Sequence, residues 1–574
     1  MVLPIMSSPI PLPDDRTRDG EPSRSAPLDT FARDNLPAGH LWPDLLFEIP
    51  QYRFLGPLNA AVELLDVSLA RGRGDHPCLI DAATGEITNY RQLFERVNRI
   101  AHVLTGDLGL RTGNRVLLRS PNSPMLVACW LAVLKAGGIV VPTMPLLRAR
   151  ELGPVRDRLK IGLALCDDRL VTELEAGCGG EVCGGEVCGP NSLRIVTFSQ
   201  LSERMRGKPA DFAAAPTDAA DPCLIAFTSG TTGVPKAAVH FHRDLLAVTE
   251  GLPRFVLDAR ADDVFCAGSS LAFTYGLGGA ILFPLRLGAT SVLVEAPTPE
   301  ALLDALADHS VTVCLSIPTA YRSMTGLASS REMPRLRACI SAAETLPARI
   351  IDDWRSMTGL PIVDTIGSTE MLHTFIANPP DALRPGATGK PLPGYQAIVV
   401  DEDFRPVPAG EVGRLAVRGP VGCRYLDDPR QTQYVQHGWN VTGDAFLVDQ
   451  EGYFWYRGRT DDMIVSAGYN ISGIEIEAVL LEHAAVRECA VVASPDDRRG
   501  MIPKAFVVPR EPVRPGSDLV GELQEFVKKQ IAPYKYPRRV EFLDALPRTE
   551  TGKIQRFKLR ELEIERVAVE KAER

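Results

Sequence analysis

Short apolar segments alternate with helix-spaced apolar residues through the first two thirds of the chain. The pattern predicts strands at residues 115–118, 139–142, 161–166, 224–227, 264–267, 291–294, 311–315 and 338–341. Helical spacing at 93–104, a fully apolar helix at 125–134 and another near 280–285 fall between these strands. Such alternation predicts parallel sheets covered by helices on both faces, in more than one unit.

The pattern changes after Asp381. Short strands at 397–400 and 414–418, separated by Gly and Pro turns, predict a small antiparallel sheet or barrel. A polar break at 458–462 precedes a section with its own helix near 523–531 and strands near 489–493 and 504–508. The fold class predicted is therefore α/β, with a large N-terminal domain of doubly wound parallel sheets plus a small β-barrel-like part, and a smaller, mobile α+β C-terminal domain. The domain bounds expected are 1–30 for a disordered N-terminal tail, 31–460 for the large domain and 461–574 for the small domain.

Composition narrows the functional classes. The 574 residues carry a net charge of −9, which argues against a nucleic-acid binder because phosphate neutralisation needs a basic face. The longest apolar run, 125–134, is too short for a membrane span, which needs about 20 residues. The N-terminus lacks the basic start and apolar segment of a signal peptide, so we expect a cytoplasmic protein.

The twelve cysteines do not form the pattern of a disulfide framework, since the chain is long and most of them sit in apolar segments. Three of them, Cys178, Cys183 and Cys188, fall in a Gly-rich duplicated insert at 177–190. Their spacing matches no common zinc site and no His lies nearby. A duplicated surface loop is the better interpretation of this insert.

The run from Thr228 to Lys236 contains four hydroxyl side chains, two glycines and a terminal lysine. It follows the strand at 224–227 and precedes a helix that we expect at 237–248. Hydroxyls, close backbone approach and a lysine can replace the hydration shell of a polyphosphate. It is not a Walker A loop, because Pro235 precedes the lysine and Ala237 follows it. Taken alone, the run could equally be a flexible linker.

Four further stretches follow in order, at 364–370, 440–444, 456–470 and 547–553. Together with the first, they resemble the motif set of the adenylate-forming superfamily, which includes acyl-CoA synthetases, peptide-synthetase adenylation domains and firefly luciferase. The resemblance covers nearly everything from about Leu45 onward. It implies an enzyme that joins a carboxylate to the α-phosphate of ATP, releases pyrophosphate and passes the acyl group to a thiol such as CoA.

The resemblance also implies roles for individual residues. Glu370 would bind Mg²⁺, and Lys553, with Thr369 and Glu370, would carry catalysis. Asp444 would accept hydrogen bonds from the ribose hydroxyls. The full nucleotide-binding set implied is Thr228, Ser229, Gly230, Thr231, Thr232, Gly233, Lys236, Ala343, Glu344, Asp364, Thr365, Thr369, Asp444, Arg459 and Lys553.

One placement of the small domain cannot serve both adenylation and the later transfer to the thiol, because the thiol must approach where Lys553 had been. The superfamily rotates its small domain between the steps, and the pivot matches Asp461. Ser466, Gly468 and Tyr469 match positions at the CoA site.

The run 366–373 has Ile366 where most of the superfamily has an aromatic residue. With 240–244 and 274–279, it resembles the benzoate and 2-aminobenzoate CoA ligase branch. Plain benzoate ligases are more apolar at the positions of Thr274 and Thr374, so the resemblance points to a substituted benzoate such as 2-aminobenzoate. The ring pocket of that branch matches Thr274, Tyr275, Ala342, Gly367, His373 and Thr374.

Three functions remain open at this stage. The first is an aryl-CoA ligase with ATP, Mg²⁺, CoA and an aromatic acid as its small-molecule partners. The second is a stand-alone adenylation enzyme that loads an aryl acid onto a carrier protein. The third is a nucleotide-binding protein without catalysis. The sequence is compatible with a homodimer but does not fix the oligomeric state.

Overall fold

The structure is a computed structural model. It describes residues 25–178, 193–228, 235–327, 331–344, 346–466, 469–496, 500–510, 516–531, 535–548 and 554–572.

A six-stranded sheet forms the first α/β unit, with the order β6-β5-β3-β4-β7-β8. All neighbours are parallel except β7 and β8, which are antiparallel. Helix α4 (Pro124–Lys135) connects β3 to β4 and is buried along nearly its whole length. The strands are β3 (Arg115–Arg119), β4 (Ile139–Thr143), β5 (Leu163–Cys166), β6 (Arg194–Thr197), β7 (Pro222–Thr228) and β8 (Lys236–Phe241).

A nine-stranded sheet forms the second α/β unit, with the order β15-β14-β13-β12-β11-β9-β10-β1-β2. Its middle strands are parallel, while β2, β14 and β15 add antiparallel edges. The strands are β1 (Pro77–Asp81), β2 (Ile87–Asn89), β9 (Val264–Ala267), β10 (Thr290–Leu293), β11 (Val313–Ser316), β12 (Ala338–Ser341), β13 (Ile362–Gly367), β14 (Thr374–Ala377) and β15 (Lys390–Pro391).

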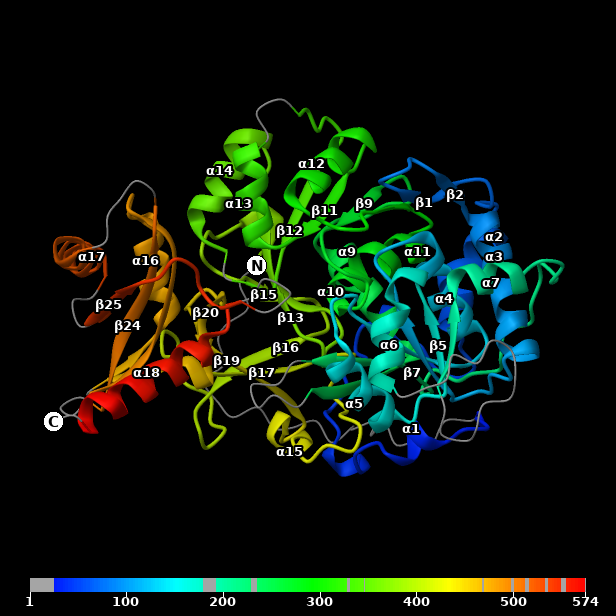
Figure 1. The fold of residues 1–574 in the computed structure, drawn as a ribbon, viewed down its shortest axis with the longest axis horizontal. Helices are drawn as coiled ribbons and strands as arrows, with labels where there is room; N and C mark the ends of the chain where they lie inside the picture. The colour runs from blue at the N-terminus through cyan, green and yellow to red at the C-terminus, as the bar shows by residue number, and fades with distance from the viewer. Residues whose placement is uncertain are drawn as a thin grey trace.

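Both faces of the nine-stranded sheet are buried. In β11, Val313 and Leu315 join the large core, whereas Cys314 between them joins a second core on the opposite face. Figure 1 shows helices α12, α13 and α14 together along one side of this sheet, and they supply the second core. These helices are α12 (Pro299–Asp308), α13 (Pro318–Leu327) and α14 (Ala348–Thr358). The expected doubly wound arrangement is confirmed.

The other face of that sheet packs on helices that also cover the six-stranded sheet, so one large core joins the two α/β units. The contributing elements include α3 (Tyr90–His102), α4, η7 (Gly278–Leu282) and α11 (Phe283–Leu287). The remaining α-helices of the described residues in this region are α1 (Phe31–Asp34), α2 (Val67–Ala70), α5 (Ala149–Leu159), α6 (Val171–Cys178), α7 (Phe198–Arg204), α8 (His242–Ala247), α9 (Leu252–Phe255) and α10 (Thr274–Leu277).

A five-stranded antiparallel sheet follows, as the short Gly-bounded and Pro-bounded strands predicted. Its path is β16-β17-β19-β18, and β20 pairs with β19. The strands are β16 (Gln396–Val400), β17 (Gly413–Arg418), β18 (Val435–Gln436), β19 (Trp439–Val448) and β20 (Phe454–Arg459).

The C-terminal part is an α+β unit that lies at one end of the molecule, beside β19 and β20 (Figure 1). Its sheet contains β21 (Ile464–Ser466), β22 (Tyr469–Ile471), β23 (Val486–Asp496), β24 (Gly500–Pro509) and β25 (Arg539–Phe542). Helices α16 (Gly473–Glu482) and α17 (Ser517–Gln530) cover one face, and α18 (Arg556–Ala572) covers the other. Val491 and its neighbour Val492 accordingly belong to different cores.

The helix expected at 237–248 is wrong over its first half. Residues 236–241 form β8, which pairs with β7 and, on its other edge, with the segment around Arg424. The two sets of backbone hydrogen bonds hold this apolar run extended, and a short apolar run does not distinguish strand from helix. Helix α8 begins at His242, where the Asp244 carboxylate accepts a hydrogen bond from the Phe241 amide at 3.1 Å.

The disordered tail expected over residues 1–30 is wrong at its C-terminal end. Ser25 donates to Asp221 at 2.5 Å, and Asp29 forms an ion pair with Arg115. Residues 25–30 are therefore bound to the large domain by polar contacts. Residues 1–24 and 179–192, which include most of the insert at 177–190, lie outside the described residues.

The buried ion pair of Lys135 and Asp66 provides a test of the large core. Lys135 Nζ lies 2.8 Å from Asp66 Oδ2, and the lysine side chain is 1% exposed. Asp66→Ala leaves a buried ammonium without its carboxylate, so we expect the free energy of unfolding to fall by about 3 kcal/mol in urea denaturation. Asp66→Ala combined with Lys135→Met should recover most of that loss.

The matched control is Asp75→Ala, which removes a surface pair with Arg91 at 3.6 Å. Both of its partners are exposed, so we expect a change of less than about 1 kcal/mol. Equal losses for the two single variants would contradict this account of the core.

Candidate active site

A carboxylate, a hydroxyl and an ammonium meet where three chain segments converge. Glu370 follows β13, Lys236 begins β8, and Tyr425 lies in the segment that borders β8. The Tyr425 hydroxyl donates to Glu370 Oε1 at 2.5 Å, and Lys236 Nζ donates to the same hydroxyl at 3.0 Å. Tyr425 is fully buried and Glu370 nearly so. The sequence motifs led us to expect Glu370 and Lys236 here, and the structure links them through one tyrosine.

A second tyrosine completes this cluster. The Lys236 ammonium lies 4.9 Å from the ring centre of Tyr425 and 5.7 Å from that of Tyr434. The Tyr434 hydroxyl is within 3.2 Å of Ser368 Oγ, two residues before Glu370. Burial and the charge of Glu370 raise the pKa of Tyr425, so its hydroxyl keeps the proton that it donates.

Asp444 and Arg459 face each other across the paired strands β19 and β20. Arg459 Nη1 donates to Asp444 Oδ1 and to the Thr442 carbonyl, both at 2.9 Å. Burial raises the pKa of Asp444, the nearby charge of Glu370 adds to that, and Arg459 opposes both. Gly443, which directly precedes Asp444, has a φ of +74°. A Cβ at this position would lie 2.7 Å from the Arg459 guanidinium. The effect of the Glu370 charge on the pKa of Asp444 places the Asp444–Arg459 pair near the Glu370 cluster.

The residues matched to the adenine site lie at the carboxyl ends of β12 and β13, where ligands of open α/β sheets usually bind. Thr365 Oγ1 donates to the Ser341 carbonyl at 2.9 Å, which ties the two strands together. Glu344 Oε2 accepts from the Thr319 amide at 3.2 Å. Burial raises the pKa of Asp364 well above its ordinary value. Ala343 has a φ of +73°, a strained value for a residue with a side chain.

Aromatic rings gather around His373, just after the Glu370 turn. The Tyr275 ring stacks on it at 5.5 Å between centres with 24° between planes, and the Phe283 ring meets it edge-on at 4.6 Å. Within hydrogen-bond distance, Thr374 Oγ1 lies 3.1 Å from His373 Nδ1. Burial lowers the pKa of His373 to about 4, so the ring is neutral at pH 7. Flat rings thus line this part of the site.

The other residues matched to the ring pocket are small or buried. A Cβ on Gly367 would lie 2.4 Å from the His373 carbonyl oxygen, so no larger residue fits there without movement. Ala342 is buried at the end of β12, and Thr274 is buried in the first turn of α10. The Tyr275 hydroxyl donates to the Ser316 carbonyl at 3.2 Å, which fixes its ring.

Several expected site residues lie outside the described residues. These are Ser229, Gly230, Thr231, Thr232, Gly233, Gly468 and Lys553. For Asp461 and Tyr469 the description covers the backbone, in η9 (Thr460–Asp462) and β22 respectively. Thr228 ends β7, Thr369 lies in the Glu370 turn, and Ser466 is buried in β21.

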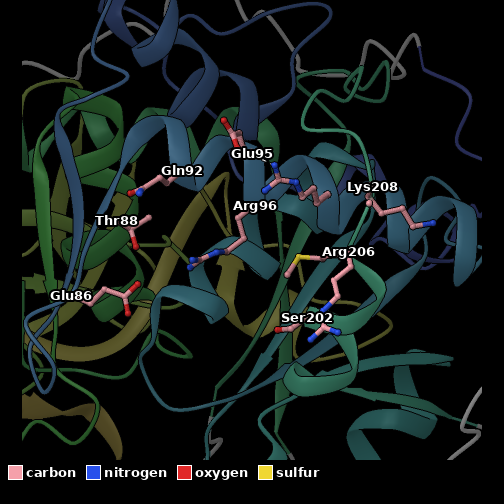
Figure 2. Close-up of a pocket in the computed structure, with 11 residues that line it drawn as sticks. Glu86, Thr88, Gln92, Glu95, Arg96, Ser202, Arg206 and Lys208 are labelled. Atoms are coloured by element: carbon pink, nitrogen blue, oxygen red, sulfur yellow. Dashed lines mark hydrogen bonds and ion pairs between the residues drawn. The ribbon is translucent and has the colours of Figure 1, made fainter.

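An open groove with a volume of about 560 Å³ lies elsewhere, between α3 and α7. Figure 2 shows charged side chains along it, among them Arg96, Arg206 and Lys208. None of the expected site residues lines this groove, so it is separate from the cluster around Glu370.

Tyr425 and Tyr434 were not among the site residues predicted from the sequence. Both tyrosines follow the Gly-Pro turn at 419–420 in a stretch without a regular apolar period. The signal available was a pair of aromatic residues in a polar segment close to Asp444. Such a signal is too weak without knowledge of the neighbouring strands.

Two protein-family models match the chain. The model for the AMP-binding enzyme matches residues 67–425, which is more than half of the chain, and the model for the AMP-binding enzyme C-terminal domain matches 475–553. The chain belongs to the AMP-binding enzyme family. The family assignment agrees with the nucleotide motifs found above.

Relatives within the AMP-binding enzyme family refine the comparison. The benzoate–CoA ligase of Thauera aromatica is 38% identical over 516 residues, or 88% of this chain and 95% of the relative. A solved anthranilate CoA ligase in complex with anthranoyl-AMP is 32% identical, with a TM-score of 0.82 over 88% of this chain and 97% of that one. A benzoate CoA ligase from Burkholderia xenovorans LB400 is 32% identical, with a TM-score of 0.78 over 88% of this chain and all of that one. The expected place in the adenylate-forming superfamily, near benzoate and 2-aminobenzoate CoA ligases, is confirmed.

The described residues contain neither a membrane-spanning helix nor a cluster of metal-binding side chains. No helix there is long and apolar enough to cross a membrane. No group of three or more His, Cys, Asp or Glu side chains in that part of the chain could hold a metal ion by itself.

Tyr425→Phe tests the hydroxyl that joins Glu370 to Lys236. The change keeps the ring but removes the shared hydrogen-bond partner of both charges, and a hydrogen bond to a charged group contributes about 1.5 to 3 kcal/mol. We expect the affinity for ATP with Mg²⁺ to fall by about tenfold or more in isothermal titration calorimetry. An unchanged affinity would show that the hydroxyl does not organise the nucleotide site.

Proposed function

We propose that the chain is an AMP-forming acid–CoA ligase that adenylates an aromatic carboxylic acid and transfers the acyl group to CoA. The preferred acid that we propose is 2-aminobenzoate or a related substituted benzoate. The observation that carries the aromatic assignment is the cluster of flat rings around His373. A ring slot would lie beside this cluster, towards the small Ala342 and Gly367.

In the first half-reaction, a carboxylate oxygen of the acid forms a bond to the α-phosphorus of ATP, and the bond to pyrophosphate breaks. Two anions must meet, so catalysis is mainly charge neutralisation and positioning. The loop from Thr228 to Lys236 would hold the β- and γ-phosphates. The position of the Lys236 ammonium in the Glu370 cluster supports this role.

Glu370 would bind Mg²⁺, which would neutralise phosphate charge when bound. The Glu370 carboxylate fits Mg²⁺ because this ion prefers hard oxygen ligands. Among the described residues, Tyr425 donates a hydrogen bond to Oε1 of this carboxylate. Oε2 would then hold the Mg²⁺. A single protein carboxylate suits Mg²⁺ that is held largely by substrate phosphates.

The nucleoside would lie between the strand ends and the Asp444 pair. Asp444 would accept the ribose hydroxyls, and Arg459 would orient its carboxylate through the 2.9 Å hydrogen bond. The adenine ring would border Ala343, Glu344, Asp364 and Thr365. Support comes from the position of these residues at the carboxyl ends of adjacent parallel strands.

In the second half-reaction, the CoA sulfur attacks the acyl carbon and AMP leaves. We propose that Lys553 serves only the first step, and that rotation at Asp461 then brings Ser466, Gly468 and Tyr469 to the thiol path. The proposed units are the large domain from about residue 31 to 460 and the small domain from 461 to 574. A carrier protein in place of CoA is the alternative acceptor of the acyl group.

The direct test of this function is pyrophosphate release across a panel of acids, repeated with CoA and with a carrier protein as acceptor. We expect release with aromatic acids and thioester formation with CoA. Thioester formation with the carrier protein alone would replace the CoA assignment by the alternative acceptor.

Lys553→Ala separates the two half-reactions. Removing one electrostatic stabiliser of the transition state should lower acid-dependent pyrophosphate release by roughly 10²- to 10³-fold. Thioester formation from preformed acyl-AMP and CoA should survive, because Lys553 is not needed there. Equal losses in both assays would count against the assigned role.

Substrate choice depends on the polar groups beside the ring slot. Thr274, His373 and Thr374 could bind a ring substituent, and polar groups left unpaired by the wrong ligand raise selectivity. We expect 2-aminobenzoate or a hydroxybenzoate to have a higher kcat/KM than benzoate, and all three to exceed octanoate by at least about tenfold. Thr374→Val, which removes a hydroxyl at nearly constant volume, should narrow the gap between substituted and plain benzoate.

Two outcomes of these rate measurements would count against different parts of the proposal. A parent enzyme that prefers octanoate would overturn the aromatic assignment. One that prefers plain benzoate would overturn only the argument from the polar groups.

A further inference from the structure

His240 contacts the backbone of the turn that carries Glu370. It lies on β8, is fully buried, and its Nε2 is 2.8 Å from the Thr369 carbonyl oxygen. A carbonyl accepts hydrogen bonds, so Nε2 carries the proton and donates it. Thr369 directly precedes Glu370, so this contact restrains the position of the proposed Mg²⁺ ligand.

Asp244 lies behind His240. Its carboxylate is fully buried, and Oδ2 is 3.8 Å from His240 Nδ1, which is too far for a hydrogen bond. Burial alone would raise the pKa of Asp244, but His240, Arg424 and Arg243 together hold it below its ordinary value. The carboxylate is therefore charged. Its Oδ2 accepts a hydrogen bond at 3.1 Å from the amide of Phe241, the residue directly after His240, and so holds the backbone beside the histidine.

Arg424 connects the same carboxylate to the other side of Glu370. Its guanidinium is 3.8 Å from Asp244 Oδ2, 4.5 Å from the ring centre of Trp42 and 4.6 Å from that of Phe241. The next residue is Tyr425, whose hydroxyl donates to Glu370. The Asp244 carboxylate thus lies near both His240 and Arg424. His240 contacts the backbone of the Glu370 turn, and Arg424 directly precedes Tyr425, which contacts the Glu370 side chain.

We propose that His240 and Asp244 are positioning residues for adenylation, which hold the Thr369 carbonyl and thereby the Glu370 carboxylate in place for the metal–nucleotide complex. The proposal rests on the proposed role of Glu370 in the first half-reaction. It predicts a defect confined to that half-reaction, because thioester formation from acyl-AMP involves no polyphosphate.

Two variants of His240 test the donor. His240→Leu removes it, whereas His240→Gln keeps an N–H that can reach the Thr369 carbonyl. We expect His240→Leu to lower kcat/KM for ATP with Mg²⁺ in pyrophosphate release by at least about tenfold, and His240→Gln to recover most of the loss. Thioester formation from chemically prepared 2-aminobenzoyl-AMP and CoA should stay within about twofold of the parent for both.

His242→Gln is the matched control. His242 is an equally buried histidine two residues away, and its Nδ1 accepts from the Ala60 amide at 3.1 Å, away from Glu370. This variant should lower the melting temperature without separating the two half-reactions. If His240→Leu slows both half-reactions equally and in step with its melting temperature, the role is structural and the proposal is overturned.

Failure of the proposed function gives a different result. A parent enzyme that releases no pyrophosphate with any acid would overturn that function. Calorimetric binding of ATP with Mg²⁺ to the parent and to His240→Leu then decides the positioning role. A loss of tenfold or more supports it, and equal affinities overturn it. Asp244→Asn, which keeps the shape of the side chain, repeats the comparison if His240→Leu does not fold.

Discussion

The Tyr425 hydroxyl is the contact on which the arrangement of the site depends. It is fully buried between the Glu370 carboxylate and the Lys236 ammonium, and buried charges need partners of this kind. Tyr425 lies 55 residues from Glu370 and 189 from Lys236 along the chain. Strand β8 brings these residues together, because it pairs with β7 on one edge and with the Tyr425 segment on the other.

Local strain accompanies this arrangement. Ala343 and Leu372 have φ values of +73° and +65°, and each such residue costs about 1 to 3 kcal/mol unless its surroundings hold it. Both lie at the carboxyl edge of the nine-stranded sheet, one after β12 and one just before β14. Two parallel strands tied by Thr365 and a core on each sheet face supply the rigidity that keeps these conformations.

The sequence predicted buried strands well and long-range contacts poorly. The strands at 264–267 and 338–341 coincide with β9 and β12, because a short apolar run between turns suits a strand buried on both faces. The apolar run of β8 predicts a helix, but its extended form depends on the segment near Arg424, which lies far away in the sequence. Contacts of residues 25–30 with Asp221 and Arg115 were missed for the same reason. The motif resemblance predicted Glu370, Lys236 and Asp444 as site residues. It did not predict Tyr425, because the contacts of Tyr425 with Glu370 and Lys236 join three segments that are distant in the sequence.

The most direct test of the account follows oxygen atoms through the reaction. The enzyme is supplied with an aromatic acid that carries ¹⁸O in both carboxylate positions, together with ATP, Mg²⁺ and CoA, and the AMP is analysed by mass spectrometry. Attack of the carboxylate on the α-phosphorus, followed by thiol attack at the acyl carbon, leaves one ¹⁸O on AMP. The account predicts this single label on AMP. Unlabelled AMP, with the label in inorganic phosphate or retained in full by the acid, would contradict it.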